Sequence, residues 1–266
     1  MMKLSKNVLL LAAAFMICQV SASVSAQTSD QFQAFTLVLE TPNTKYLELQ
    51  PIPLIITFKN DTKTPLTGHT VLKFGASFLH LYIDRPDGPQ EVPVSMLISD
   101  VVASSRVFQP GEQIKETTAL GYKLNNVFPT LGNYRLHVRL RSLDGRDTVS
   151  SKPIEVAIVK PEGRDAQALQ FIRDHSDPAY FFTGISAVKN PEQLKVLEDF
   201  VALYGDSAYG DDASLTLAHL QFAQRDYDKA RTIFEKLLKK PNYIFASEVS
   251  KYLRLIEQRM RVAERP

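Results

Sequence analysis

The chain has 266 residues, of which 44% are hydrophobic and 23% charged, with 31 Lys and Arg against 29 Asp and Glu. This length allows one large domain or two ordinary ones, and the hydrophobic content excludes a wholly disordered chain. The near-neutral charge gives no reason to expect nucleic acid or an anionic membrane as a partner. We expect no nucleic-acid binding and at most a peripheral contact with a membrane.

Residues 1–26 have the pattern of a signal peptide. Lys3 and Lys6 precede an apolar run from Val8 to Ile17, and a stretch of small residues ends at Ala26. The run is too short for a membrane span, and Ala22 offers a second cleavage site. We expect a mature chain that is periplasmic or secreted after cleavage.

The single cysteine, Cys18, lies inside this segment. The residue before a lipidated cysteine is normally small, whereas Ile17 is large, so we interpret Cys18 as part of the removed signal rather than as a lipid anchor. The mature chain then contains no cysteine and folds without disulfides. Removal of Lys3 and Lys6 leaves 29 basic against 29 acidic residues.

Residues 33–161 are dominated by a period of two. Leu54, Ile56 and Phe58 alternate with Ile55 and Thr57, and the same alternation recurs near residues 79–83, 134–140 and 154–158. Gly, Pro, Asn and Asp mark the turns between these runs. The pattern predicts an antiparallel β-sandwich without helices.

The run Leu131-Gly132-Asn133-Tyr134 resembles the tyrosine corner of immunoglobulin-like domains. The resemblance implies an immunoglobulin-like sandwich in which Tyr134 is structural, its hydroxyl bonding to nearby backbone. The disulfide and core tryptophan of antibody domains are both missing, which places the resemblance with the broad bacterial class.

Beyond a predicted linker with short helices at 162–189, residues 190–263 follow a helical period. Two short helices between Asp211 and Pro241 meet near Arg225, and a 34-residue offset equates Phe200 with Phe234. A shared period of this length is typical of a helical repeat.

This half resembles tetratricopeptide repeats, through residues that the resemblance makes structural: Ala218, Tyr227, Ala230 and Phe234, with Pro241 closing the unit. The aromatic residue and the glycine expected early in the first helix are absent, and Arg225 stands where a small residue is common. Together, the strand period of residues 33–161 and the helical period of residues 190–263 predict a two-domain fold, all-β plus all-α. Similar arrays hold a peptide or partner helix on a concave face, which maps here to Asp212, Leu215, His219 and Phe222. Packing of Leu215 and Phe222 against neighbouring helices is the competing interpretation.

A two-repeat array also exposes its last helix. We expect the apolar stripe of that helix to dock on the sandwich, on a second copy of the chain or on a partner. The stripe comprises Ile244, Val249, Leu253, Ile256 and Met260.

Motifs for catalysis or metal binding are missing from the sequence. The histidines show no zinc-like spacing, and the mature chain has no cysteine nucleophile or phosphate-binding glycine loop. The spacing of Asp206, Asp211 and Asp212 does not match a calcium loop, and carboxylates at a helix N-terminus explain these residues better. We expect the chain to have no enzymatic activity, no cofactor and no metal site.

The predicted function is that of an exported, non-enzymatic binding or scaffold protein. Its partner would be another envelope protein or a peptide, held by the helical half, and the last helix offers a route to self-association. The alternative is a carbohydrate-binding or cell-envelope accessory protein acting through the sandwich. The chain has no tryptophan for a sugar platform, so Tyr82, Tyr122 and Phe128 would have to replace it.

Overall fold

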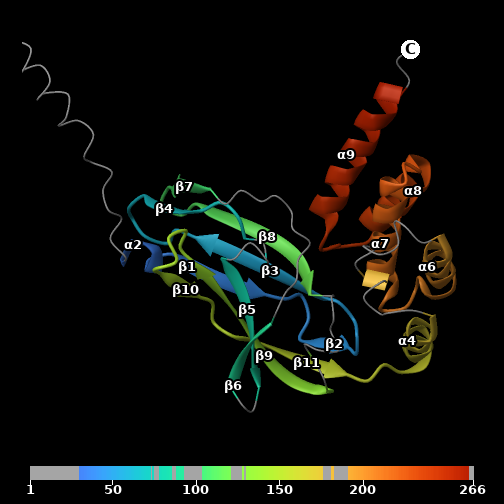
Figure 1. The fold of residues 1–266 in the computed structure, drawn as a ribbon, viewed down its shortest axis with the longest axis horizontal. Helices are drawn as coiled ribbons and strands as arrows, with labels where there is room; N and C mark the ends of the chain where they lie inside the picture. The colour runs from blue at the N-terminus through green and yellow to red at the C-terminus, as the bar shows by residue number, and fades with distance from the viewer. Residues whose placement is uncertain are drawn as a thin grey trace, which may run out of the picture.

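The computed structural model describes residues 30–72, 74, 78–85, 88–92, 104–120, 128, 130–175, 181–182 and 191–263. The predicted signal peptide at 1–26, Tyr122 and parts of the predicted linker lie outside these residues. The described chain forms a β domain followed by a run of helices (Figure 1).

Two main sheets and a small strand pair build the β domain. The first sheet holds β1 (Thr36–Glu40), β3 (Ile52–Lys59) and β8 (Gln113–Leu120), in that order. The second is ordered β2 (Lys45–Leu47), β11 (Ile154–Val159), β9 (Gly132–Arg141), β5 (Leu79–Arg85) and β6 (Gly88–Val92), with β10 (Thr148–Ser150) on β9. The pair is β4 (Leu66–His69) with β7 (Ser105–Phe108), beside α2 (Asp30–Gln33).

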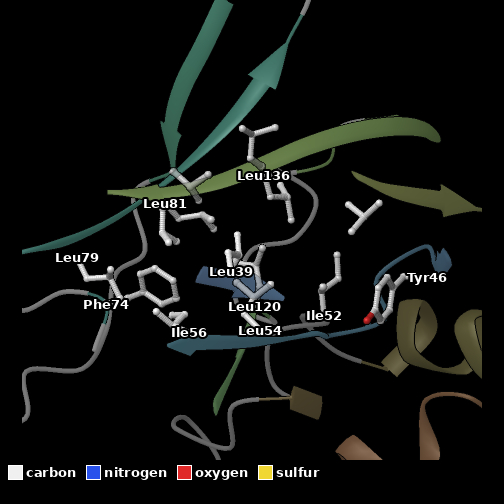
Figure 2. Close-up of a cluster of buried hydrophobic side chains, with 14 of the residues drawn as sticks. Leu39, Tyr46, Ile52, Leu54, Ile56, Phe74, Leu79, Leu81, Leu120 and Leu136 are labelled. Atoms are coloured by element: carbon white, nitrogen blue, oxygen red, sulfur yellow. The ribbon is translucent and has the colours of Figure 1, made fainter. Parts of the chain in front are cut away.

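The core lies between the two main sheets, as the alternation predicted. Ile52, Leu54 and Ile56 of β3 are fully buried and face Leu81 and Leu136 of the opposite sheet (Figure 2). Each such side chain contributes about 1.5–3 kcal/mol by leaving water. The β domain is thus a sandwich held by burial.

One pairing departs from the antiparallel expectation. β2 runs parallel to β11, with Ala157 opposite Lys45 and Val159 opposite Leu47. Parallel strands require a long connection, and most of the sandwich sequence lies between β2 and β11. The short strand therefore extends the second sheet at the end nearest the helices (Figure 1).

The tyrosine-corner prediction is confirmed in its hydrogen bond. The hydroxyl of Tyr134 donates to the Thr130 carbonyl oxygen at 2.6 Å. Phe128 packs edge-on against the same ring, with centroids 4.8 Å apart. Tyr134 is 8% exposed, so it anchors the start of β9 in the core.

The helical part contains α4 (Gly163–His175), α6 (Pro191–Tyr204), α7 (Gly210–Ala223), α8 (Tyr227–Leu238) and α9 (Ala246–Ala263). These helices follow one another along one end of the sandwich (Figure 1), and each of the first four contacts the next. Arg225 takes a left-handed conformation, φ 66°, in the turn before α8. Asp226 then caps α8 by accepting a hydrogen bond from the Lys229 amide at 3.3 Å.

The 34-residue offset has a counterpart in the packing. Phe200 of α6 and Phe234 of α8 are both fully buried, as are Ala218 and Ala230 where the helices approach. The offset fails at the next equivalent pair, since Leu203 and Leu237 differ in exposure, at 53% and 2%.

The last helix contradicts its prediction. We expected its apolar stripe to dock on the sandwich, on a second copy or on a partner, but the stripe packs on the preceding helix: Val249 and Ile256 are buried in one cluster with Ala230 and Phe234 of α8. Leu253 and Met260 pack against the same cluster. Self-association through this helix therefore does not follow from an unburied stripe.

None of the described helices is long and apolar enough to cross a membrane.

Sandwich and helices share one core. Residues of α4, α6 and α7 belong to the same buried cluster as the sheets. The Tyr209 hydroxyl donates to the Glu48 carbonyl oxygen at 2.7 Å, and Arg173 pairs with the Glu48 carboxylate at 2.6 Å. This junction fixes α7 against the end of the sheet.

Candidate binding cleft between the sheet and the helices

Three of the four predicted partner-binding residues line a cavity between α7 and β8. Asp212, Leu215 and His219 lie three and four positions apart on α7, so they share one helix face. The cavity has a volume of about 230 Å³, and we call it the inner pocket. Its remaining walls are Pro51, Thr117, Thr118, Ala119, Phe182, Thr216, Phe245 and Glu248.

A larger cavity, the outer groove, continues from the inner pocket between β8 and α9. Its volume is about 770 Å³, and it shares Thr117, Phe245 and Glu248 with the inner pocket. Its other walls are Lys115, Glu116, Ile244, Ser247, Lys251, Tyr252 and Arg254. Pocket and groove together form one cleft, bounded by β8 on one side and by α7 and α9 on the other.

The cleft borders the edge of β8 rather than one face of its sheet. Successive side chains of a strand point to opposite faces, yet the consecutive residues 115–119 all line the cleft. One edge of β8 is taken by β3, with Thr117 opposite Ile55. Among the described strands β8 has no second partner. The other edge of β8 therefore borders the cleft and has no strand partner among the described residues.

The fourth predicted residue, Phe222, lies elsewhere. Its ring centroid is 5.6 Å from that of Tyr227 and 5.1 Å from that of Tyr252, which meets it edge-on. Phe222 thus packs between α7, α8 and α9 and is not among the residues that line the cleft. The cleft faces the sandwich and is not an open concave surface of the helices alone.

Asp212 places an unpaired carboxylate in the inner pocket. Its neighbour Asp211 forms an ion pair with Lys240. Asp212 has no hydrogen bond or ion pair within the described chain. Burial, and then the charge of Asp211, raise the pKa of Asp212 from 3.8 to about 7. Desolvation disfavours the charged form, which the pocket leaves uncompensated.

His219 does not supply the missing positive charge. Burial lowers the pKa of its imidazole to about 4, so the ring is neutral at neutral pH. Its Nε2 atom lies 3.4 Å from Oε1 of Glu248 but has no hydrogen-bond partner. The hydroxyl of Tyr243 is also buried without a partner, and burial, with Asp212 and Asp211, raises its pKa. Tyr243 is not among the residues that line the pocket, so the pocket's own groups with unused hydrogen-bonding capacity are Asp212 and His219.

This chemistry suits binding. No group of three or more His, Cys, Asp or Glu side chains in the ranges that the structure describes could hold a metal ion. Sequence reasoning found the α7 face but missed the contributions of β8, Phe245 and Glu248. A sequence signal for β8 existed only in the weak alternation of its residues, and nothing in the sequence indicated that this edge lies opposite α7.

The residues of the carbohydrate alternative are dispersed. Phe128 is buried against Tyr134. Tyr82 lies on the outer side of the second sheet, stacked on His137 with centroids 5.1 Å apart. The guanidinium of Arg139 lies 4.5 Å from the same ring centroid. The two described aromatic residues therefore do not form a common platform.

A third cavity, of about 150 Å³, lies at the far end of the sandwich beside α2. His69 lines it and binds the Arg141 carbonyl oxygen through Nε2 at 2.6 Å. Ser142 donates to Asp144 at 2.6 Å, which organises the adjacent hairpin turn. This arrangement is that of a turn, and it is separate from the cleft.

No protein-family model matches the chain, and no curated protein matches it. The sporulation control protein Spo0M from Bacillus subtilis is 14% identical over 53% of this chain and 55% of its own, with a TM-score of 0.33. A β-glucosidase from Listeria innocua is 17% identical over 47% of this chain and 16% of its own, with a TM-score of 0.26. The CARDB domain of the PF1109 protein from Pyrococcus furiosus is 12% identical over 49% of this chain and 97% of its own, with a TM-score of 0.27.

The chain thus spans just over half the length of Spo0M and a small part of the glucosidase. At these TM-scores the likenesses carry no argument about function.

Proposed function

We propose that this chain is an exported, non-enzymatic binding protein that holds an extended segment of another envelope protein in the cleft. In this proposal the β domain is immunoglobulin-like and the helices form a short tetratricopeptide-like array. The signal-peptide pattern supports export to the periplasm or beyond the cell. The fully buried Phe200 and Phe234 at the 34-residue offset support the repeat.

The observation that carries the proposal is the edge of β8 in the cleft. A strand edge presents a row of backbone N–H and C=O groups, and an extended peptide satisfies them by adding a strand. β8 has eight residues, long enough for such pairing. The main chain then provides affinity, while the α7 and α9 side chains across the cleft read the side chains of the bound segment.

The test is peptide binding to the full mature chain. Extended peptides selected from a random displayed library are labelled, and their dissociation constants are measured by fluorescence anisotropy. Ser247 is exposed and lines the outer groove on α9, so Ser247→Trp fills the groove. Gln258→Trp adds the same ring at an exposed position of α9 that does not line the cleft.

We expect Ser247→Trp to weaken binding by about tenfold or more, because a side chain in the groove competes with the peptide. Gln258→Trp is expected to bind like the unmodified chain. Equal affinities for the two variants would contradict binding in the cleft, as would a library that yields no binding peptide.

A further inference from the structure

We propose that the inner pocket binds a positively charged group of the bound segment, a lysine or arginine side chain that reaches Asp212. This inference rests on the proposed function for its ligand, and it adds the chemistry by which the cleft selects one.

The inner pocket holds the unpaired carboxylate of Asp212. Of the residues that the structure describes, Asp212 and Glu248 line the inner pocket and no Lys or Arg does so. His219, the remaining titratable wall, is neutral and has a buried Nε2 without a hydrogen-bond partner. A carboxylate in a partly desolvated cavity gains most from a ligand that brings both a positive charge and N–H donors.

The described basic residues near the cleft lie outside the inner pocket. Lys240 forms an ion pair with Asp211, the neighbour of Asp212 in the sequence. Lys251 and Arg254 line the outer groove on α9 instead. The space beside Asp212 is therefore open to a ligand and is not closed by an internal ion pair among the described residues.

Charge is divided along the cleft. The inner pocket carries acidic groups, and the outer groove carries Lys115, Lys251 and Arg254 against Glu116 and Glu248. An extended segment that pairs with β8 spans both regions. Its complementary sequence has a lysine or arginine at the inner end and acidic residues toward the outer end, which also sets the direction in which the segment lies.

The first arm of the test does not need a peptide. The apparent pKa of Asp212 is measured from its side-chain ¹³C resonance in the full chain, with butylammonium, with propylguanidinium and with neutral butanol. A cation present at ten times its dissociation constant lowers this pKa by about one unit, whereas butanol leaves it unchanged. Comparison of the two cations distinguishes lysine from arginine selection. No shift with either cation would overturn the proposal.

The second arm uses peptides selected on the full chain. Each lysine is replaced by norleucine and each arginine by citrulline, and dissociation constants are measured on the unmodified chain and on Asp212→Asn. We expect one position at which neutralisation weakens binding about tenfold on the unmodified chain and less than about twofold on Asp212→Asn.

Equal losses on both proteins at every position would overturn the cation pocket while strand addition remained. Shifts with the small cations, combined with no peptide binding, would instead contradict the proposed function and support the cation pocket.

Discussion

Replacement of Asp212 by asparagine tests the electrostatics of the cleft through stability. A carboxylate in the first turn of a helix normally stabilises it through the helix dipole, by about 0.3–1 kcal/mol. The surroundings of Asp212 reverse this expectation, because burial and Asp211 raise its pKa from 3.8 to about 7. The folded chain then holds the proton to higher pH than the unfolded chain, so ionisation of Asp212 opposes folding.

The rise in the pKa of Asp212 sets the size of this stability change. A rise of about three pKa units corresponds to an upper bound of about 4 kcal/mol, at about 1.36 kcal/mol for each pKa unit. The residual exposure of Asp212 and the helix dipole reduce this, so we expect Asp212→Asn to raise the free energy of unfolding on the order of 2 kcal/mol above pH 7. The gain should vanish below about pH 4, where the carboxyl is protonated in both states.

Urea unfolding of the full chain between pH 4 and pH 8 measures this difference. Subtracting the pH dependence of the unfolding free energy of the unmodified chain from that of Asp212→Asn cancels the contributions of the other titrating groups. Asp228 provides the matched control, since it is an exposed acidic residue in the first turn of α8. Asp228→Asn should lower stability slightly, by about 0.3–1 kcal/mol. A loss of stability for Asp212→Asn at pH 8, similar to that of the control, would refute the reasoning.

Three further predictions concern the fold. Tyr134→Phe removes the corner hydrogen bond and should lower the free energy of unfolding by about 0.5–1.5 kcal/mol, and an unchanged urea midpoint would contradict that role. Leu203→Ala should change stability by less than about 0.5 kcal/mol, whereas the equivalent Leu237→Ala should lower it by about 2–5 kcal/mol. Equal losses for the two leucines would mean that the offset, rather than local burial, governs packing. Tyr209→Phe removes the hydroxyl contact to Glu48 and should cost about 0.5–1.5 kcal/mol, with faster amide exchange at the start of α7 as its local signature. Unchanged exchange there would show that this contact does not hold the junction.

Local patterns predicted much of the architecture. The alternation at Leu54, Ile56 and Phe58 identified β3 and its buried face, because strand periodicity depends only on neighbours in sequence. Helix α6 begins at Pro191 as its first-turn proline indicated. Tyr134 could be assigned because its hydrogen bond closes over four residues.

The rest depended on contacts distant in sequence. The parallel pairing of β2 with β11 and the burial of the α9 stripe against α8 both arise from chain reversals that periodicity does not encode. The same limit applies to the cleft. Asp212 was singled out by its helix face, but its opposition to β8 depends on how the sandwich and α7 share a core.

Amide hydrogen exchange along β8 tests the central claim most directly. The full chain is compared with and without a saturating selected peptide, and protection is followed at Gln113–Leu120. The account predicts that alternate amides on the free edge of β8 become protected, because an added strand bonds to every second residue. Unchanged exchange throughout β8, with protection confined to other surfaces, would contradict strand addition in the cleft.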